Sequence, residues 1–116
     1  MPMKLYAARC AQRRCLLDAA VERVLAVCRA EPSVRKAFVF GSYASGTIGP
    51  TSDLDILIVR DTELGIVDRV ADLAFAARTV VALDLVVVTP EERETTFSRS
   101  SFGRTVLSTA QRIYAA

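Results

Sequence analysis

The sequence predicts an α/β fold, a small mixed β-sheet flanked by helices. Two stretches, one that ends near residue 30 and one that spans 62–78, repeat apolar residues at helical spacing. Three short apolar runs, at 37–40, 54–59 and 80–88, have the length and composition of buried strands. Because helical and strand-like segments alternate along the chain, we expect the helices to lie against a sheet.

The first helix is expected to run to about Ala30, and Pro32 ends it. Charged residues take the side opposite its apolar stripe, as in an amphipathic helix. The stripe consists of Leu16, Leu17, Ala20, Val21, Val24, Leu25 and Cys28. We assign 1–33 to an N-terminal helical segment of a single domain that comprises residues 1–116.

Residues 34–90 are assigned to the sheet core of this domain. The run 37–40 ends at Gly41 and Ser42, which suits a buried strand that enters a turn. The run 54–59 is expected to form the second strand.

The helix at 62–78 follows the second strand, and Gly65 weakens its first turn. The third strand, 80–88, reads VVALDLVVV. It is too rich in β-branched residues to favour a helix, and it is apolar on both faces. We therefore expect it at the centre of the sheet.

After the third strand, Thr89, Pro90 and Glu92 match an N-cap, a proline at the first helical position and a glutamate that bonds back to the cap. A short helix or turn should begin there. Residues 91–116 are expected to form a C-terminal helix. Its apolar positions are Phe102, Val106, Leu107, Ala110, Ile113 and Tyr114.

Composition points to a soluble, cytoplasmic protein. Hydrophobic residues make up 52% of the chain and the mean hydropathy is +0.30, yet no apolar run approaches the ~20 residues of a membrane-spanning helix. Arg9, Arg13 and Arg14 interrupt the N-terminal stretch, which therefore does not match a secretory signal. No membrane association is expected.

The net charge of +2 is too small to indicate a nucleic-acid-binding protein, and no direct nucleic-acid partner is expected. Arg9, Arg13, Arg14 and Arg23 do concentrate positive charge near one end, and we interpret them as a solvated face, with a polyanion site as the alternative. The chain has three cysteines, no CxxC spacing and no histidine, so neither a zinc site nor a disulfide framework is supported.

Three aspartates mark the candidate site. Asp53 and Asp55 are two residues apart at the start of a strand, so both should project from one face, with Cα atoms about 6.5–7 Å apart. Asp84 is the only charged residue of the 80–88 strand, where an unpaired carboxylate would cost several kcal/mol. If the second and third strands are neighbours, all three carboxylates approach and need a cation among them.

Carboxylate oxygens without histidine or thiolate favour a hard ion, Mg²⁺ or Mn²⁺. Two such ions could clamp the attacking and leaving oxygens of a phosphoryl-type transfer. Gly41 would let the backbone approach a phosphate, and the Ser42 hydroxyl could bond its oxygens.

Structural alternatives exist for these aspartates. Asp53 could cap a turn after Thr51 and Ser52. Asp84 could pair with a buried arginine; the candidates are Arg35, Arg60, Arg69 and Arg78.

Together these residues resemble the minimal nucleotidyltransferases of the DNA polymerase β superfamily. The signature of that family is glycine-serine, ten residues, then Asp-x-Asp. Here Gly41 and Ser42 are followed by the ten residues 43–52 and then by Asp53, Leu54 and Asp55. The resemblance extends over about 34–114 and implies a polymerase β palm-like fold.

The resemblance also implies roles for these residues. Asp53 and Asp55 would bind the metals that hold a nucleoside triphosphate, and Asp84 would bind the catalytic metal and help activate the acceptor. Gly41 and Ser42 would hold the β- and γ-phosphates. The implied cofactors are two Mg²⁺ ions, with Mn²⁺ as a substitute, and the implied reaction transfers AMP from ATP to a hydroxyl.

Small members of this family commonly act as antitoxins of HEPN-type ribonuclease toxins and modify a toxin tyrosine with AMP. A HEPN-type toxin is therefore the implied partner, and a homo-oligomer is compatible with the sequence. Many members carry an arginine where Ser45 stands here. A cationic contact to the triphosphate would then be absent or would come from another arginine.

Three other readings remain open. The chain could neutralise its partner by binding alone, with a vestigial acidic site. It could be a nucleotidyltransferase for a small molecule such as an aminoglycoside, although the helical domain such enzymes use would have to come from another chain. A phosphoacceptor receiver domain also gathers aspartates, but Lys4 and Lys36, the only lysines, are badly placed for it.

Overall fold

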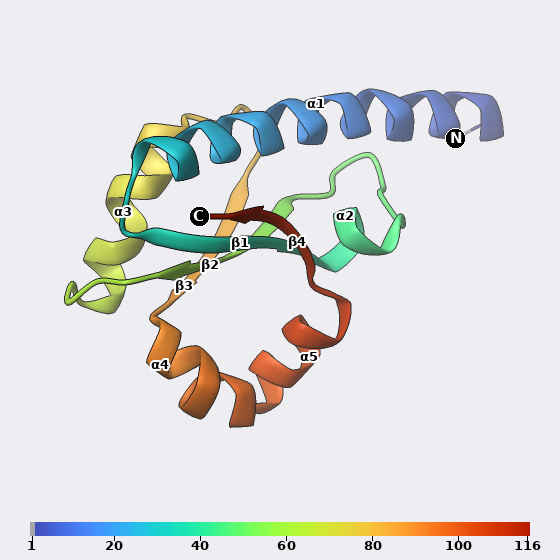
Figure 1. Cartoon of the computed structure of the whole chain (residues 1–116). Coiled ribbons are helices and arrows are strands. Elements are labelled where there is room, and N and C mark those ends of the chain that lie inside the picture. The colour runs from blue at the N-terminus through green and yellow to red at the C-terminus, as the bar shows by residue number, and fades with distance from the viewer. Residues whose placement is uncertain (1) are drawn as a thin grey trace.

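Four strands form one mixed sheet in the order β3-β2-β1-β4 (Figure 1). The computed structural model describes residues 2–116. β1 (Val34–Phe40) runs antiparallel to β2 (Leu54–Arg60) and to β4 (Gln111–Ala115), whereas β3 (Leu83–Val88) runs parallel to β2. The prediction of an α/β fold with a small mixed sheet flanked by helices is confirmed.

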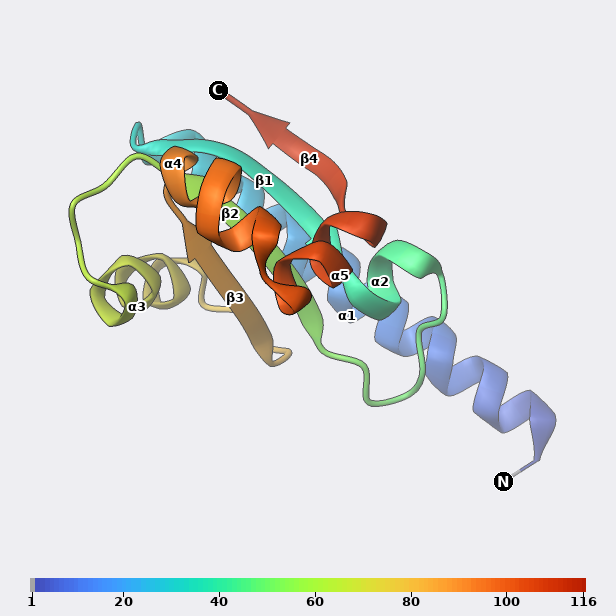
Figure 2. The ribbon, with the colours of Figure 1, turned by 90° about the horizontal axis from the view of Figure 1, so that it is seen from below.

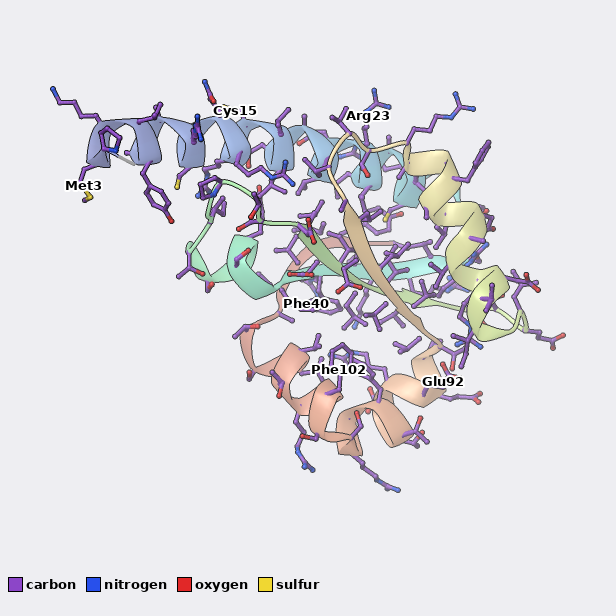
Figure 3. All side chains as sticks on the ribbon, turned by 180° about the vertical axis from the view of Figure 1, so that it is seen from behind. Met3, Cys15, Arg23, Phe40, Glu92 and Phe102 are labelled. Atoms are coloured by element: carbon purple, nitrogen blue, oxygen red, sulfur yellow. The ribbon has the colours of Figure 1, made fainter. Side chains whose placement is uncertain are left out.

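Helices cover both faces of the sheet (Figure 1). α1 (Met3–Ala30) and α3 (Ile66–Ala77) pack on one face. The other face is covered by α4 (Pro90–Glu92), by the π-helical segment η1 (Arg93–Phe97) that continues it, and by α5 (Ser101–Thr109). Figure 3 shows side chains filling both of the layers between sheet and helices. A further, short helix, α2 (Gly41–Ser45), follows β1 directly.

Side-chain alternation along β2 distributes its residues between the two cores. Leu54, Ile56 and Ile58 are buried against α1 and α3, whereas Leu57 and Val59 are buried on the α5 side. Because successive side chains of a strand point to opposite faces, the consecutive apolar residues 56–59 of β2 can all be packed.

α1 is much longer than the sheet that it covers. Its buried residues begin at Leu17, and the first half of the helix extends beyond the sheet, with Met3 at its far end (Figures 2 and 3). The helix ends at Ala30, as its sequence predicts. Among residues 2–116 there is no helix with the combined length and apolar character that a membrane span requires.

The prediction of a C-terminal helix over 91–116 is wrong at its end. α5 stops at Thr109, because Ala110 has extended backbone angles, and residues 111–115 then pair with β1 as β4. Ile113 and Tyr114 still pack against the core, but from a strand. Their spacing from the α5 stripe imitates a helical repeat, whereas their backbone satisfies the edge of β1.

The prediction of a central third strand is also wrong. β3 begins at Leu83 rather than at residue 80 and lies at an edge of the sheet. Val80 is 85% exposed, and Asp84 is exposed as well. The expected cost of burying the Asp84 carboxylate therefore does not arise.

The capping box predicted after the third strand is confirmed. The Thr89 hydroxyl accepts from the Glu92 backbone N–H at 3.1 Å, and the Glu92 carboxylate accepts from the Thr89 N–H at 2.9 Å. The same carboxylate accepts from Arg69 of α3 at 2.6 Å, so the box also joins the helices of opposite faces. Figure 3 shows Glu92 where β3 passes into α4.

Arg60, at the end of β2, is a buried cation, and each of its three nitrogens has a hydrogen-bond acceptor. Its two terminal nitrogens donate to the Asp72 carboxylate, both at 2.8 Å, and its Nε donates to the Ser33 hydroxyl at 2.9 Å. The Arg60 side chain is 6% exposed, whereas that of Asp72 is 51% exposed. Hydrogen bonding from Arg60 lowers the pKa of Asp72 below its usual value.

We predict that Asp72→Asn lowers the free energy of unfolding at pH 7 by about 1–3 kcal/mol, because it leaves the Arg60 guanidinium buried without its counter-charge. Since the pKa of Asp72 is lower in the folded than in the unfolded chain, its stabilisation is present above about pH 4 and is lost as the pH falls below that value. Urea unfolding of both proteins should therefore give free energies whose difference shrinks progressively as the pH falls below about 4.

Asp61→Asn is the matched control, because Asp61 forms an exposed pair with Arg35 at 3.4 Å. Such pairs contribute little, so this variant should unfold nearly as the wild type does. An equal loss in both variants, or an Asp72→Asn effect that does not change with pH, would contradict the assignment.

Candidate active site

Asp55 and Asp84 lie opposite each other on neighbouring parallel strands. They are register partners in the pairing of β2 with β3. Strands in a sheet are about 4.8 Å apart, and both side chains lie on the α5 face, which Leu57 and Val59 of β2 share. The sequence-predicted approach of these two carboxylates is thus present in the structure.

The pKa of Asp55 is raised in this environment. Burial raises it above the usual value, and the charges of Asp84 and then Asp53, with a side-chain hydrogen bond to Asp84, raise it further. Asp55 is half-buried, whereas Asp84 is exposed on the edge strand. A buried arginine does not neutralise Asp84, because each candidate is engaged elsewhere: Arg35 with Asp61, Arg60 with Asp72, Arg69 with Glu92, and Arg78 on the Phe75 ring.

Asp53 is placed differently from the sequence expectation. β2 begins at Leu54, so strand alternation does not govern the Asp53 side chain. Its side chain is 56% exposed, and its carboxylate lies 3.8 Å from the guanidinium of Arg13. Among residues 2–116, no three acidic or thiol side chains form a group that could hold a metal ion as they stand. The structure therefore brings together two of the three predicted carboxylates.

Gly41 is required by its contact with Asp55. Its φ is +68°, in the left-handed region, and a Cβ built on it would overlap Oδ2 of Asp55. Phe40 and Asp55 are register partners of β1 and β2, which explains the proximity. The close backbone approach that the sequence predicts at Gly41 is made here to a carboxylate.

The rest of the glycine-serine turn is held by hydrogen bonds. The Ser42 carbonyl accepts from the Thr47 N–H at 3.0 Å, and the hydroxyls of Ser45 and Thr47 are 2.8 Å apart. Ser42 is half-buried and Ser45 is exposed.

Tyr43 ties this turn to α1. Its hydroxyl donates to Asp18 at 2.5 Å, and the Arg14 guanidinium lies 5.8 Å from its ring centre. Burial and then the Asp18 hydrogen bond raise the pKa of Tyr43 to about 12. The hydroxyl is thereby committed to a contact that holds α1 against α2.

Arg13 is the site residue that the sequence interpretation missed. It belongs to the arginine group interpreted as a solvated face, yet its side chain is only 21% exposed and its Nε donates to the Ser52 carbonyl at 2.7 Å. One signal was available: Arg13 lies one helical turn before Leu17, in line with the buried stripe of α1.

Asp55 and Asp84 suit a divalent cation by chemistry. Both offer carboxylate oxygens, the ligands that Mg²⁺ and Mn²⁺ prefer. After burial, the charge of Asp84 is the next cause of the raised pKa of Asp55, and a bound cation would relieve this repulsion. Asp53 is close enough to contribute charge but is engaged with Arg13.

Comparison with known proteins adds independent information. Residues 21–108 match the family model described as a nucleotidyltransferase domain. No curated protein sequence matches the chain.

Solved structures share the fold. A Sulfolobus solfataricus protein classed as a nucleotidyltransferase aligns with a TM-score of 0.66 at 24% identity, over 92% of this chain and 87% of that one. A toxin–antitoxin complex crystallised with AMP-PNP aligns with a TM-score of 0.58 at 21% identity, over 82% of this chain and 73% of that one. A variant of the MntA–HpeT toxin–antitoxin complex aligns with a TM-score of 0.57 at 22% identity, over 82% of this chain and 72% of that one. At these identities the likeness concerns the fold.

We predict that Asp84→Asn lowers the pKa of Asp55, because it removes the largest electrostatic cause of the increase, and that the pKa stays above its ordinary value because burial remains. A carboxyl ¹³C NMR titration measures this directly. An acid whose pKa is raised by folding destabilises the chain once pH exceeds the unfolded value, so the variant should also be more stable at pH 7.

Asp61→Asn controls for a general change in charge, because Asp61 lies six residues beyond Asp55, about 20 Å along an extended chain. If the pKa of Asp55 is the same in Asp84→Asn as in the wild type, the two carboxylates are not close together.

A second prediction compares Gly41→Ala with Gly46→Ala. Both glycines have positive φ, so each alanine should cost about 1–2 kcal/mol of stability. Only the Gly41 substitution places a methyl group on Asp55, since a Cβ at Gly46 meets no atom within 4 Å. Gly41→Ala should therefore weaken Mn²⁺ binding, measured by electron paramagnetic resonance, about tenfold or more, and Gly46→Ala should not. Equal Mn²⁺ affinities in the two variants would mean that Asp55 is not a ligand.

Proposed function

This chain belongs to the nucleotidyltransferase domain family, and on that premise we propose that it is a Mg²⁺-dependent enzyme that transfers AMP from ATP to a tyrosine hydroxyl of a HEPN-type toxin. It would thereby act as the antitoxin of a toxin–antitoxin pair. The observation that carries the proposal is the apposition of Asp55 and Asp84 on parallel strands, with Gly41 packed against Asp55.

Each predicted site residue has a role in this proposal. Asp53, Asp55 and Asp84 would hold two Mg²⁺ ions, and Gly41 and Ser42 would contact the β- and γ-phosphates. The ions would supply charge neutralisation of the phosphates and a lower pKa of the acceptor hydroxyl. Asp53 would take part after leaving Arg13.

The reaction itself is a substitution at the α-phosphorus. The acceptor oxygen forms a bond to this phosphorus while the bond to the oxygen bridging the α- and β-phosphates breaks, and pyrophosphate leaves. The acceptor proton passes to the Asp84 carboxylate. Catalysis by this chain is then mainly alignment of the reactants and electrostatic stabilisation.

An exposed position for Asp84 supports a macromolecular acceptor. Asp84 lies on an edge strand, where a tyrosine on the surface of another protein can approach it. A small molecule would require walls around it, and β3 contributes none on its outer edge. The fold likeness to toxin–antitoxin complexes, one of them with AMP-PNP, supports the same choice.

A non-catalytic antitoxin is the second candidate. The engagement of Asp53 with Arg13, which leaves two carboxylates together rather than three, is the observation that favours it. Such a protein would neutralise its partner by forming a complex with it.

Incubation with Mg²⁺, ATP labelled at the α-phosphate and lysate of the host should label a protein band, and parallel incubations with the other nucleotides identify the donor. We predict that Asp55→Asn and Asp84→Asn each reduce labelling about a hundredfold, because each removes a proposed metal ligand. Asp61→Asn should label normally. Full labelling by the Asp84 variant would exclude the proposed chemistry.

Suppression of the toxin separates the two candidates. If Asp84→Asn still forms the complex but no longer suppresses toxicity, transfer is the function. If it still suppresses toxicity, neutralisation is by binding.

A further inference from the structure

Arg13 connects α1 to the candidate site across the layers of the fold. Its Nε bonds the Ser52 carbonyl at 2.7 Å, and one terminal nitrogen lies 3.8 Å from the Asp53 carboxylate. Both partners belong to the loop that leads into β2. The guanidinium thus lies directly beside the acidic end of that strand.

The position of Arg13 is fixed by its helix. One turn after Arg13, Leu17 is fully buried, and the Tyr43–Asp18 hydrogen bond holds the same part of α1 against α2. Arg13 is therefore presented from a rigid element at a constant place beside the site.

Its pairing with Asp53, however, is weak. An ion pair at 3.8 Å with a carboxylate that is 56% exposed contributes little to stability. A guanidinium has five N–H donors, and one of them is used in a hydrogen bond to Ser52. The side chain is anchored through Nε while its terminal nitrogens can exchange one anion for another.

The segment from residue 41 to residue 55 contains no lysine or arginine. It nevertheless carries both the glycine-serine turn and two of the three candidate aspartates. A triphosphate bound there has several negative charges, so a protein cation for it must come from another element. Two arginines of α1 contact this segment: Arg14 lies over the ring of Tyr43, and Arg13 contacts Ser52 and the candidate aspartate Asp53.

A hollow lies beside Arg13, between α1 and the loop. Its volume is about 310 Å³, and its lining consists of Arg9, Gln12, Arg13, Leu16, Pro50 and Thr51. Arg13 can therefore be reached by a ligand from solvent although most of its side chain is covered.

We propose that Arg13 binds the triphosphate tail of the donor nucleotide. Without nucleotide its guanidinium is held by Asp53; with nucleotide it contacts phosphate oxygens, and Asp53 becomes available to the site. This inference rests on the proposed function and assigns the cationic contact that the turn at Ser45 does not supply.

The test compares equilibrium binding of ATP and AMP, each with Mg²⁺, by isothermal titration calorimetry. Arg13→Gln removes the charge but keeps a donor for the Ser52 carbonyl, so the tether is retained. ATP should bind this variant about tenfold or more weakly, because charge-assisted hydrogen bonds to phosphate are lost, while AMP affinity changes less than about twofold. Arg13→Lys should recover part of the ATP affinity.

Arg29→Ala is the matched control, since it removes one exposed arginine from the distal end of the same helix. It should bind ATP as the wild type does. Thermal unfolding of each variant identifies any loss of folded protein, and Arg13→Lys keeps the comparison available if Arg13→Gln does not fold.

Equal weakening of ATP and AMP, or unchanged ATP affinity in Arg13→Gln, would overturn the inference. Failure of the proposed function is recognised separately, by labelling that persists in Asp84→Asn. A wild-type chain that binds no ATP would overturn both.

Discussion

The electrostatic repulsion between Asp55 and Asp84 is the constraint around which the site is arranged. Parallel pairing of β2 with β3 fixes their Cα atoms in register, so both carboxylates start from neighbouring positions on one face of the sheet. Burial first, and then the charge of Asp84, raise the pKa of Asp55, so the ionised carboxylate lowers the stability of the folded chain. Features that preserve such a cost are typical of function rather than stability.

Neighbouring elements accommodate the pair. Gly41 has no side chain, so the Asp55 carboxylate fits against its backbone. β3 lies at the edge of the sheet, where Asp84 stays hydrated. At the other end of β2, each of the three nitrogens of the buried Arg60 guanidinium has an acceptor.

Local patterns predicted much of this fold, because helical periodicity, short apolar runs and the Thr89 capping box are encoded within a few residues. The strand at residues 111–115 and the edge position of β3 were not predictable in this way, since each depends on pairing between distant segments. The same distinction holds for the site. Sequence spacing led to Asp55, Asp84 and Gly41, but the contact of Arg13 joins residues 39 positions apart and required the structure.

β3 has a strand on one side only, whereas β1 and β2 are enclosed on both. Its outer edge presents backbone N–H and C=O groups to solvent, whereas side chains of β3 such as Val87 and Val88 pack into the two cores. The open edge thus leaves space beside Asp84 for a segment of another chain, without any change in the central strands.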